Sequence, residues 1–111
     1  MLRGLFAAAA LAGLLGGAPP ADRGLDLYWI DVEGGAATLI VTPRGESILV
    51  DSGWPEERDA QRIFRAAQRA GLTRIDHYLT THWHLDHWGA LGRLVELLPV
   101  RRFYGHPFPQ G

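Results

Sequence analysis

Histidine and aspartate side chains are concentrated in one short stretch, "HWHLDH", which holds His82, His84, Asp86 and His87. In an extended segment, residues two apart point the same way, so His82 and His84 can present their imidazoles to one ion. Asp86 and His87 follow where the backbone must bend towards the next helix, and the bend can aim them at a second, neighbouring position. The spacing therefore predicts that one loop supplies ligands to two metal ions.

The composition narrows the chemistry of such a site. The sequence contains no cysteine, which excludes disulfides, thiolate ligands and a cysteine nucleophile. A metal must therefore be held by nitrogen and oxygen, a set that suits zinc and also iron or manganese. The net charge is -1 and the eleven arginines are spread along the chain, so the sequence has no basic stripe of the kind that binds nucleic acid.

The amino terminus has the layout of a secretory signal peptide. Arg3 precedes an apolar run from Leu5 to Leu15, and small residues and two prolines follow. We expect residues 1–21 to be removed, with cleavage between Gly16 and Arg23, and the remaining chain to be exported. The alternative is a membrane anchor formed by residues 4–18, but no stable membrane span is expected because a spanning helix needs about 20 apolar residues.

Short β-rich runs come first in the region that must position the cluster. Alternation in "LDLYWIDV", from Leu25, predicts a strand with at least one buried face. The runs "TLIVT" and "ESILVD" are separated by Pro43-Arg44-Gly45, which predicts a hairpin. Three strands are thus expected before any helix.

Helical and extended runs then alternate. Apolar spacing predicts a helix from Arg58 to Ala70 that ends at Gly71, with its arginines on a solvated face. The run "RIDHYLTT" predicts a fourth strand that leads directly into the histidine cluster. A second helix is expected over "ALGRLVELL" before Pro99, and "VRRFYG" predicts a fifth strand. The predicted fold class is α/β (α+β), with the cluster at the carboxyl end of a strand.

These residues match a family pattern. The stretch His82 to His87, preceded by "LTT" and followed by Gly89, resembles the signature of the metallo-β-lactamase superfamily of metal-dependent hydrolases. The segment "ILVDSG", Ile48 to Gly53, looks like that family's earlier strand-end motif, with Asp51 at its aspartate. The resemblance extends over about Leu25 to Tyr104, and the order of the two motifs is specific to the family.

The resemblance implies a fold and a division of roles. The family fold is an αββα sandwich, of which residues 25–111 would form the first half, with about five strands and two helices. His82 and His84 would bind one zinc ion, and Asp86 and His87 a second. Asp86 would also orient the nucleophile, and Asp51 would support the metal loop from beneath. The implied reaction is attack by a metal-activated hydroxide on an ester, phosphoester or amide-type substrate.

The family completes this site with histidine and aspartate ligands much farther along the chain. His106 is the only later histidine here, and it follows the very next strand, so we do not expect it to be a ligand. His77, inside the fourth strand, is expected to be structural. We therefore expect a fragment with an incomplete site, whose exposed apolar surface favours self-association.

Two alternatives to this hydrolase remain open. The stretch "DVEGGAATLIV", Asp31 to Val41, resembles the opening of the hydrolase domains attached to DNA-uptake competence proteins, which implies a competence-type nuclease. The other alternative is a non-catalytic metal-binding or interaction fragment, in which the histidines bind metal without catalysis or merely satisfy backbone groups. The substrate is not identified by the sequence.

Overall fold

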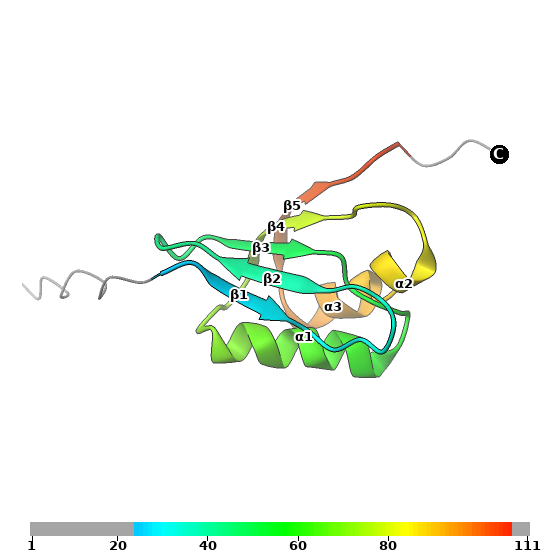
Figure 1. Cartoon of the computed structure of the whole chain (residues 1–111), viewed down its shortest axis with the longest axis horizontal. Coiled ribbons are helices and arrows are strands. Elements are labelled where there is room, and N and C mark those ends of the chain that lie inside the picture. The colour runs from blue at the N-terminus through cyan, green and yellow to red at the C-terminus, as the bar shows by residue number, and fades with distance from the viewer. Residues whose placement is uncertain (1–23, 108–111) are drawn as a thin grey trace, which may run out of the picture.

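The computed structural model describes residues 24–107, which form one mixed sheet with helices on one face (Figure 1). The strands are β1 (Asp26–Trp29), β2 (Thr38–Val41), β3 (Ser47–Val50), β4 (Ile75–Leu79) and β5 (Val100–Tyr104). The helices are α1 (Glu57–Arg69), α2 (Leu85–Trp88) and α3 (Leu91–Leu97). The proposed signal peptide, residues 1–21, and the alternative anchor, residues 4–18, lie outside the described residues.

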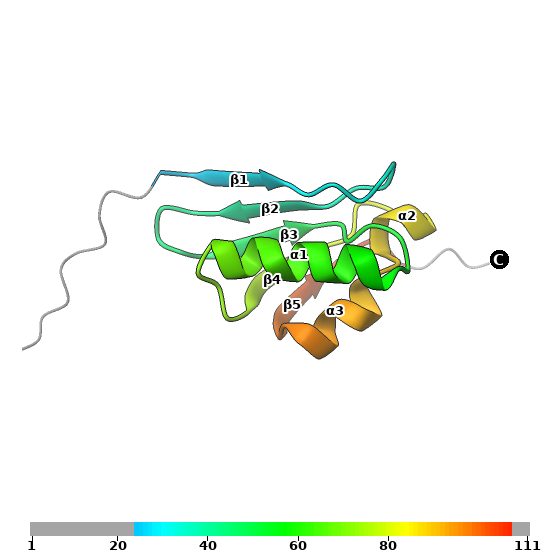
Figure 2. The ribbon, with the colours of Figure 1, turned by 90° about the horizontal axis from the view of Figure 1, so that it is seen from below.

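The strand order in the sheet is the order in the sequence, β1-β2-β3-β4-β5. The first three strands pair antiparallel, and β2 and β3 form the hairpin expected at Pro43-Arg44-Gly45. The last three strands pair parallel, which requires a crossover between each pair. Helix α1 makes the first crossover, and α2 with α3 makes the second. Both α1 and α3 lie against the same face of the sheet (Figure 2).

The core lies between this face of the sheet and the helices. Leu39, Leu49 and Tyr78 are in register on adjacent strands, and all three are fully or almost fully buried. Helix α1 contributes Ile63 to the same core, and α3 contributes Leu94. The small residues Ala60, Ala66 and Ala67 let α1 approach closely, so the helix axis is held near the sheet.

The opposite face of the sheet has no helix over it among residues 24–107. Ile40, Ile48 and Val50 on this face are only partly buried. At its margins, Leu27 is 43% exposed and Tyr104 is 46% exposed. An apolar face of this kind is normally covered by another layer of structure, which agrees with the expectation of exposed apolar surface.

Helix α1 begins and ends one residue earlier than expected. It covers Glu57–Arg69, and the chain leaves it through Gly71, whose φ of +74° favours glycine. The amide of Gly71 donates to the Gln68 carbonyl at 3.0 Å, and the amide of Leu72 donates to the Ala67 carbonyl at 2.9 Å. These bonds satisfy the carbonyl groups at the helix end, so the predicted stop is confirmed.

The region after the histidine cluster contains one element more than expected. A single helix was predicted there, whereas a one-turn helix, α2, precedes α3 and contains Asp86 and His87. Gly89 and Ala90 separate the two helices. A side chain at Gly89 would lie 2.4 Å from the Pro55 backbone nitrogen, so the chain must pass this point without one. Within residues 24–107, no helix is long and apolar enough to cross a membrane.

Candidate metal centre

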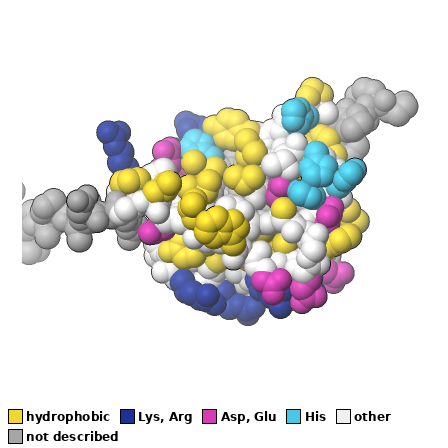
Figure 3. Space-filling model, viewed as in Figure 1, with side chains coloured by type: hydrophobic (Ala, Val, Ile, Leu, Met, Phe, Trp, Pro, Cys, Tyr) yellow, Lys and Arg dark blue, Asp and Glu magenta, His cyan; other side chains and the backbone are white. Residues whose placement is uncertain are grey.

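The predicted metal residues lie at the edge of the sheet where two parallel strands end. Asp51 directly follows β3, and Thr81 and His82 follow β4 after one further residue. Because β3 and β4 are parallel neighbours, their carboxyl ends meet at this edge, where sites in α/β proteins commonly form. Figure 3 shows histidine side chains gathered at this end of the molecule. The topology therefore brings Asp51 beneath a loop that lies about 30 residues later in the sequence.

Asp51 is 2% exposed, and its carboxylate accepts three hydrogen bonds from the metal loop. One oxygen accepts the Thr81 backbone N–H at 2.9 Å. The other accepts the Thr81 hydroxyl at 2.7 Å and His87 Nδ1 at 2.8 Å. Asp51 adopts a φ of +60°, a conformation that aspartate tolerates better than most residues. A single buried side chain thus joins the end of β3 to the start of the loop and to α2.

These contacts indicate which ring nitrogen of His82 and of His87 is available to bind a metal ion. His87 donates Nδ1–H to Asp51, so its Nε2 carries the free lone pair. The Thr81 hydroxyl has one proton, which it donates to Asp51. It can therefore only accept from His82 Nδ1, 3.0 Å away, which again leaves Nε2 free. A hydrogen bond at one nitrogen that fixes the other for a metal is typical of histidine ligands.

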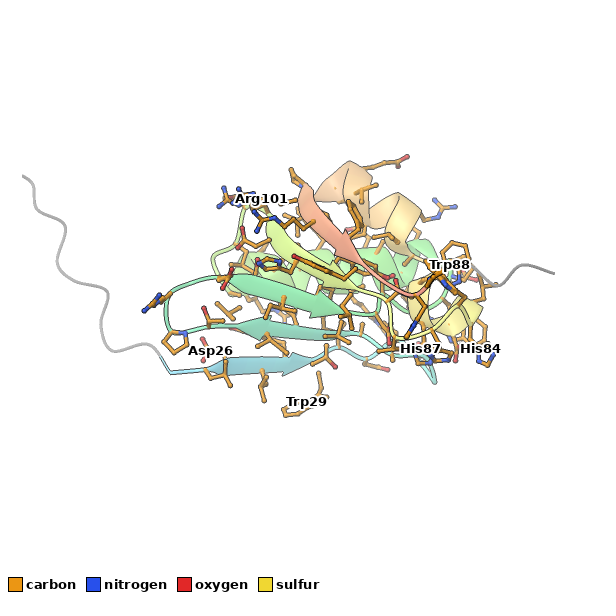
Figure 4. All side chains as sticks on the ribbon, turned by 90° about the horizontal axis from the view of Figure 1, so that it is seen from above. Asp26, Trp29, His84, His87, Trp88 and Arg101 are labelled. Carbon is orange, nitrogen blue, oxygen red and sulfur yellow. The ribbon has the colours of Figure 1, made fainter. Side chains whose placement is uncertain are left out.

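The three imidazoles of the cluster lie close together. The His82 ring centroid lies 4.6 Å from that of His84 and 3.9 Å from that of His87. His84 is exposed, and Figure 4 shows His84 and His87 side by side at the end of the molecule. Asp86 lies on the same turn as His87, with its Oδ2 3.8 Å from His87 Nε2. All four predicted residues therefore occupy one small region.

The donor chemistry of this region fits zinc, with three imidazoles and one carboxylate. However, no group of three or more histidine, aspartate or glutamate side chains in residues 24–107 is arranged so that it could hold one ion. The four side chains therefore lie together without forming a ligand set for one ion, and a four-coordinate ion here needs donors from elsewhere.

The turn after β1 holds the metal loop from its other side. In this turn, the Ala36 amide donates to the Asp86 carbonyl at 3.1 Å. After β3, the Ser52 amide also donates to the loop, to the His87 carbonyl at 2.7 Å. A side chain at Gly35 would lie only 2.4 Å from the Asp86 carbonyl oxygen. The backbone of α2 can therefore approach this turn only because residue 35 is glycine.

Two of these contributors were not predicted from the sequence. Thr81 was noted only as part of the motif, although its hydroxyl and amide both connect Asp51 to the histidines. Its position immediately before His82 was the available signal. Gly35 was noted within the opening "DVEGGAA", but its contact with Asp86 joins residues about 50 apart in sequence, which no local pattern indicates.

The two histidines outside the cluster have different surroundings. His77 lies between Glu46 and Tyr104, with Nε2 2.8 Å from the Glu46 carboxylate and Nδ1 3.0 Å from the Tyr104 hydroxyl. This position on the sheet agrees with the structural role expected for it. His106 lines a cavity of about 340 Å³ together with His82 and His84. Its backbone carbonyl accepts the indole N–H of Trp83 at 3.1 Å, which holds the chain after β5 beside the loop.

Comparison with proteins of known sequence gives several relatives of differing activity. The atrochrysone carboxyl ACP thioesterase of Aspergillus fumigatus is 35% identical over 68% of this chain and 25% of its own length. The lactamase-like protein notP of an Aspergillus strain is 35% identical over 59% of the chain and 20% of its length. The ribonuclease Z of a Bradyrhizobium strain is 39% identical over 58% of the chain and 20% of its length. The chain thus spans about a quarter or less of these relatives.

Solved structures match the fold. A HARLDQ-motif mutant of a metallo-β-lactamase from Cronobacter sakazakii superposes with a TM-score of 0.56 and 28% identity, covering 69% of this chain and 30% of the other. The subclass B3 metallo-β-lactamase MEM-A1, from a soil metagenome library, superposes with a TM-score of 0.55 and 30% identity. That match covers 67% of this chain and 28% of MEM-A1. The predicted fold class, five strands with helices in the first half of an αββα sandwich, is confirmed by these matches.

A family model covers most of the described structure. The model of the metallo-beta-lactamase superfamily matches residues 30–108, a range that contains β2 to β5, all three helices and the four predicted metal residues. The resemblance carried by "ILVDSG" and "HWHLDH" is therefore confirmed over more than half of the chain. The chain belongs to the metallo-β-lactamase superfamily.

Proposed function

We propose that this chain supplies the first metal-binding loop of a metal-dependent hydrolase. In this proposal His82 and His84 are ligands of one zinc ion, and Asp86 and His87 are ligands of a second. The support for it is the hydrogen-bond network of Asp51, which uses Nδ1 of His87 and, through Thr81, Nδ1 of His82. That network leaves Nε2 of both rings available to a metal ion.

A bound metal pair would polarise the scissile bond of the substrate and lower the pKa of a water molecule, so that hydrolysis can proceed near neutral pH. The residues of this chain have separate tasks. Asp51 keeps the imidazoles of His82 and His87 in one tautomer and one orientation. Asp86, which is partly exposed beside His87, is placed to accept a proton from the attacking water and so to orient it. We therefore propose Asp86 as the catalytic residue of this loop.

If the ligands divide between two ions as proposed, the site must be completed by further ligands. Each ion receives two donors from this loop, and a catalytic zinc site usually has three protein ligands and an open position. The relatives that the chain matches are several times longer than the matched segment. We propose that the remaining donors lie in a region corresponding to that additional length, and that the loop alone binds metal weakly.

The bond that is cleaved can be tested directly. The matched relatives are named for thioester and RNA substrates, and the matched structures for β-lactams, so an ester, thioester, phosphodiester and lactam should each be assayed. In a protein that also carries the remaining donors, we expect zinc-dependent hydrolysis of one class, lost on chelation and in Asp86→Asn. Asp26→Asn, an exposed carboxylate change on β1, is the matched control.

The main rival is a non-catalytic metal-binding or interaction fragment. The observation that favours it is that no three of the candidate ligands in residues 24–107 are arranged to hold one ion. Zinc binding that is lost in His84→Ala, without hydrolysis of any substrate, would support the rival and contradict catalysis by this chain. A competence-type nuclease is tested by the phosphodiester in the same panel. Hydrolysis of single-stranded DNA in preference to small esters would favour it over the general hydrolase.

Export from the cytoplasm is proposed on the sequence of residues 1–21 alone. The test is the mass of the mature amino terminus after expression in a bacterial host. A mass that begins between residues 16 and 23 would support export with cleavage. An intact amino terminus in the membrane fraction would support the alternative anchor at residues 4–18.

A further inference from the structure

A hollow that is not lined by the histidine cluster lies between the edge strand β1 and helix α1. Its volume is about 330 Å³, and both elements line it. The strand side includes Tyr28, Trp29 and Ile30, and the helix side includes Arg62, Arg65 and Arg69. We call this hollow the arginine groove. It combines a free strand edge, aromatic side chains and positive charge in one place.

The outer edge of β1 is free to pair with another strand. In the sheet order, β1 has β2 on one side and no strand on the other side among residues 24–107. The Ile30 amide donates to the Ala37 carbonyl at 3.0 Å, so Ile30, Tyr28 and Asp26 direct their backbone groups towards β2. The alternation of the ladder then directs the N–H and C=O groups of Leu27 and Trp29 outward. Such an edge is a ready template for an extended peptide.

The arginines of the groove differ in how their charges are compensated. Arg62 is 3.2 Å from the Asp31 carboxylate and 3.4 Å from that of Glu33, so its charge is already neutralised. Arg65 and Arg69 are exposed, and neither makes a hydrogen bond or ion pair with any residue from 24 to 107. Figure 3 shows basic side chains below one half of the molecule and acidic side chains below the other. Two guanidinium groups thus remain for an external anion.

Trp29 lies on the same edge strand, β1. Its side chain is 77% exposed, the largest exposure among the large apolar residues of the described chain. Figure 4 shows it projecting outward beyond β1. An exposed tryptophan beside a free strand edge offers apolar contact to whatever pairs with that edge.

We propose that the arginine groove binds an acidic, extended peptide segment of a partner protein, which adds to the sheet as a strand beside β1. The peptide backbone would pair with Leu27 and Trp29. Carboxylates on alternate residues would lie on the helix side of the added strand and contact Arg65 and Arg69, since side chains alternate between the two faces. Charge-assisted hydrogen bonds from guanidinium to carboxylate would select acidic sequences over basic ones.

The test uses the isotope-labelled chain and a short blocked peptide in which valine and aspartate alternate. We expect saturable binding that shifts the backbone amide signals of Leu27 and Trp29 and protects both amides from hydrogen exchange. The double change Arg65→Glu and Arg69→Glu should weaken binding by about tenfold or more, because attraction becomes repulsion. Arg102→Glu, on the strand at the opposite edge of the sheet, should leave binding within about twofold.

Three control ligands make the proposal falsifiable. A peptide with lysine in place of aspartate should not bind, and a peptide N-methylated at its pairing amides should bind at least about tenfold more weakly. Equal binding by either control would contradict the proposed strand pairing or its charge preference. Equal binding of an oligothymidylate would show that any polyanion suffices and would overturn the peptide assignment. Dimerisation that the double arginine variant abolishes would instead identify a second copy as the occupant.

Discussion

His87 Nδ1 lies 2.8 Å from the carboxylate of Asp51, so a one-turn helix of the metal loop is tied to the end of a strand 36 residues earlier. The same carboxylate also holds the amide and hydroxyl of Thr81. Asp51 therefore positions two of the proposed metal-binding imidazoles while remaining buried itself.

Replacing Asp51 should affect both the fold and metal binding. Asp51→Ala leaves the Thr81 amide and hydroxyl and His87 Nδ1 without their acceptor. We therefore expect the free energy of unfolding to fall by about 2 to 3 kcal/mol. Zinc affinity should fall about 10- to 100-fold, as is usual when a residue that orients a ligand is removed. Urea denaturation and zinc titration measure the two effects.

Asp51→Asn separates these two consequences. Asparagine keeps one acceptor and tolerates the positive φ of this position, so the stability loss should be smaller than for alanine. Its neutral amide cannot hold His87 as the carboxylate does, so zinc affinity should still fall. If the asparagine variant bound zinc as tightly as the wild type, the carboxylate of Asp51 would not support the metal loop.

Gly35→Ala should displace the metal loop. The added methyl group would meet the Asp86 carbonyl oxygen at 2.4 Å, and backbone must move to relieve the contact. We expect a loss of about 2 kcal/mol in the free energy of unfolding, together with weaker zinc binding. Gly92→Ala is the matched control, because it lies in helix α3 in open space. That change should stabilise the chain by about 0.5 to 1 kcal/mol, and equal losses at both positions would refute the close-contact explanation.

Acid stability should depend on Asp76. Burial alone would raise the pKa of Asp76, but hydrogen bonds from Arg74 and Ser47 outweigh it and lower the pKa to about 2. The stabilisation is therefore complete above about pH 4, the ordinary carboxyl range, and is lost as the pH falls towards 2. Its size is of the order of 2 kcal/mol. Denaturation midpoints should fall over this window in the wild type.

Asp76→Asn should remove that pH dependence. The amide does not titrate, so the variant should be less stable than the wild type at neutral pH and should approach it below about pH 3. Asp26→Asn, on the exposed part of β1, provides the comparison. A wild-type stability that stays flat between about pH 4 and pH 2 would contradict the lowered pKa of Asp76.

The open face of the sheet should promote self-association of this chain. Leu27 and Leu79 are exposed there, and half-buried Ile48 lies between them on β3. We expect sedimentation to show concentration-dependent oligomers that Leu27→Lys with Leu79→Lys greatly reduces. Val95→Lys, at a similarly exposed position on α3, is the control. If Val95→Lys reduced association as much as the double leucine change, the contact would not be the open face of the sheet.

The sequence was most informative where local patterns and motif spacing agree. Alternation and turn residues predicted all five strands, and the periodicity before Gly71 predicted α1 to within a residue. The motif spacing predicted that His82 and His84 lie together, and the structure places His87 beside them. The position of Asp51 beneath the loop was implied only by the family resemblance, and its carboxylate contacts His87 there.

Contacts between distant segments could not be predicted from local patterns. The one-turn helix α2 is too short to show a period, so Asp86 and His87 were expected only at a bend. The arginine face of α1 was expected to be uniformly solvated. In the structure, Arg58 and Arg62 pair with acidic residues of the turn after β1, whereas Arg65 and Arg69 stay exposed. That difference depends on how the turn packs against the helix.

The central claim is that the histidine cluster binds metal, and the most direct test is zinc content measured by elemental analysis of the chain after equilibrium dialysis against excess zinc. The comparison includes His84→Ala and, as the matched control, His77→Ala, since His77 lies outside the cluster on β4. We predict zinc in the wild type and in His77→Ala, and its loss from His84→Ala. Zinc that is absent from the wild type, or that is unchanged by His84→Ala, would contradict the account.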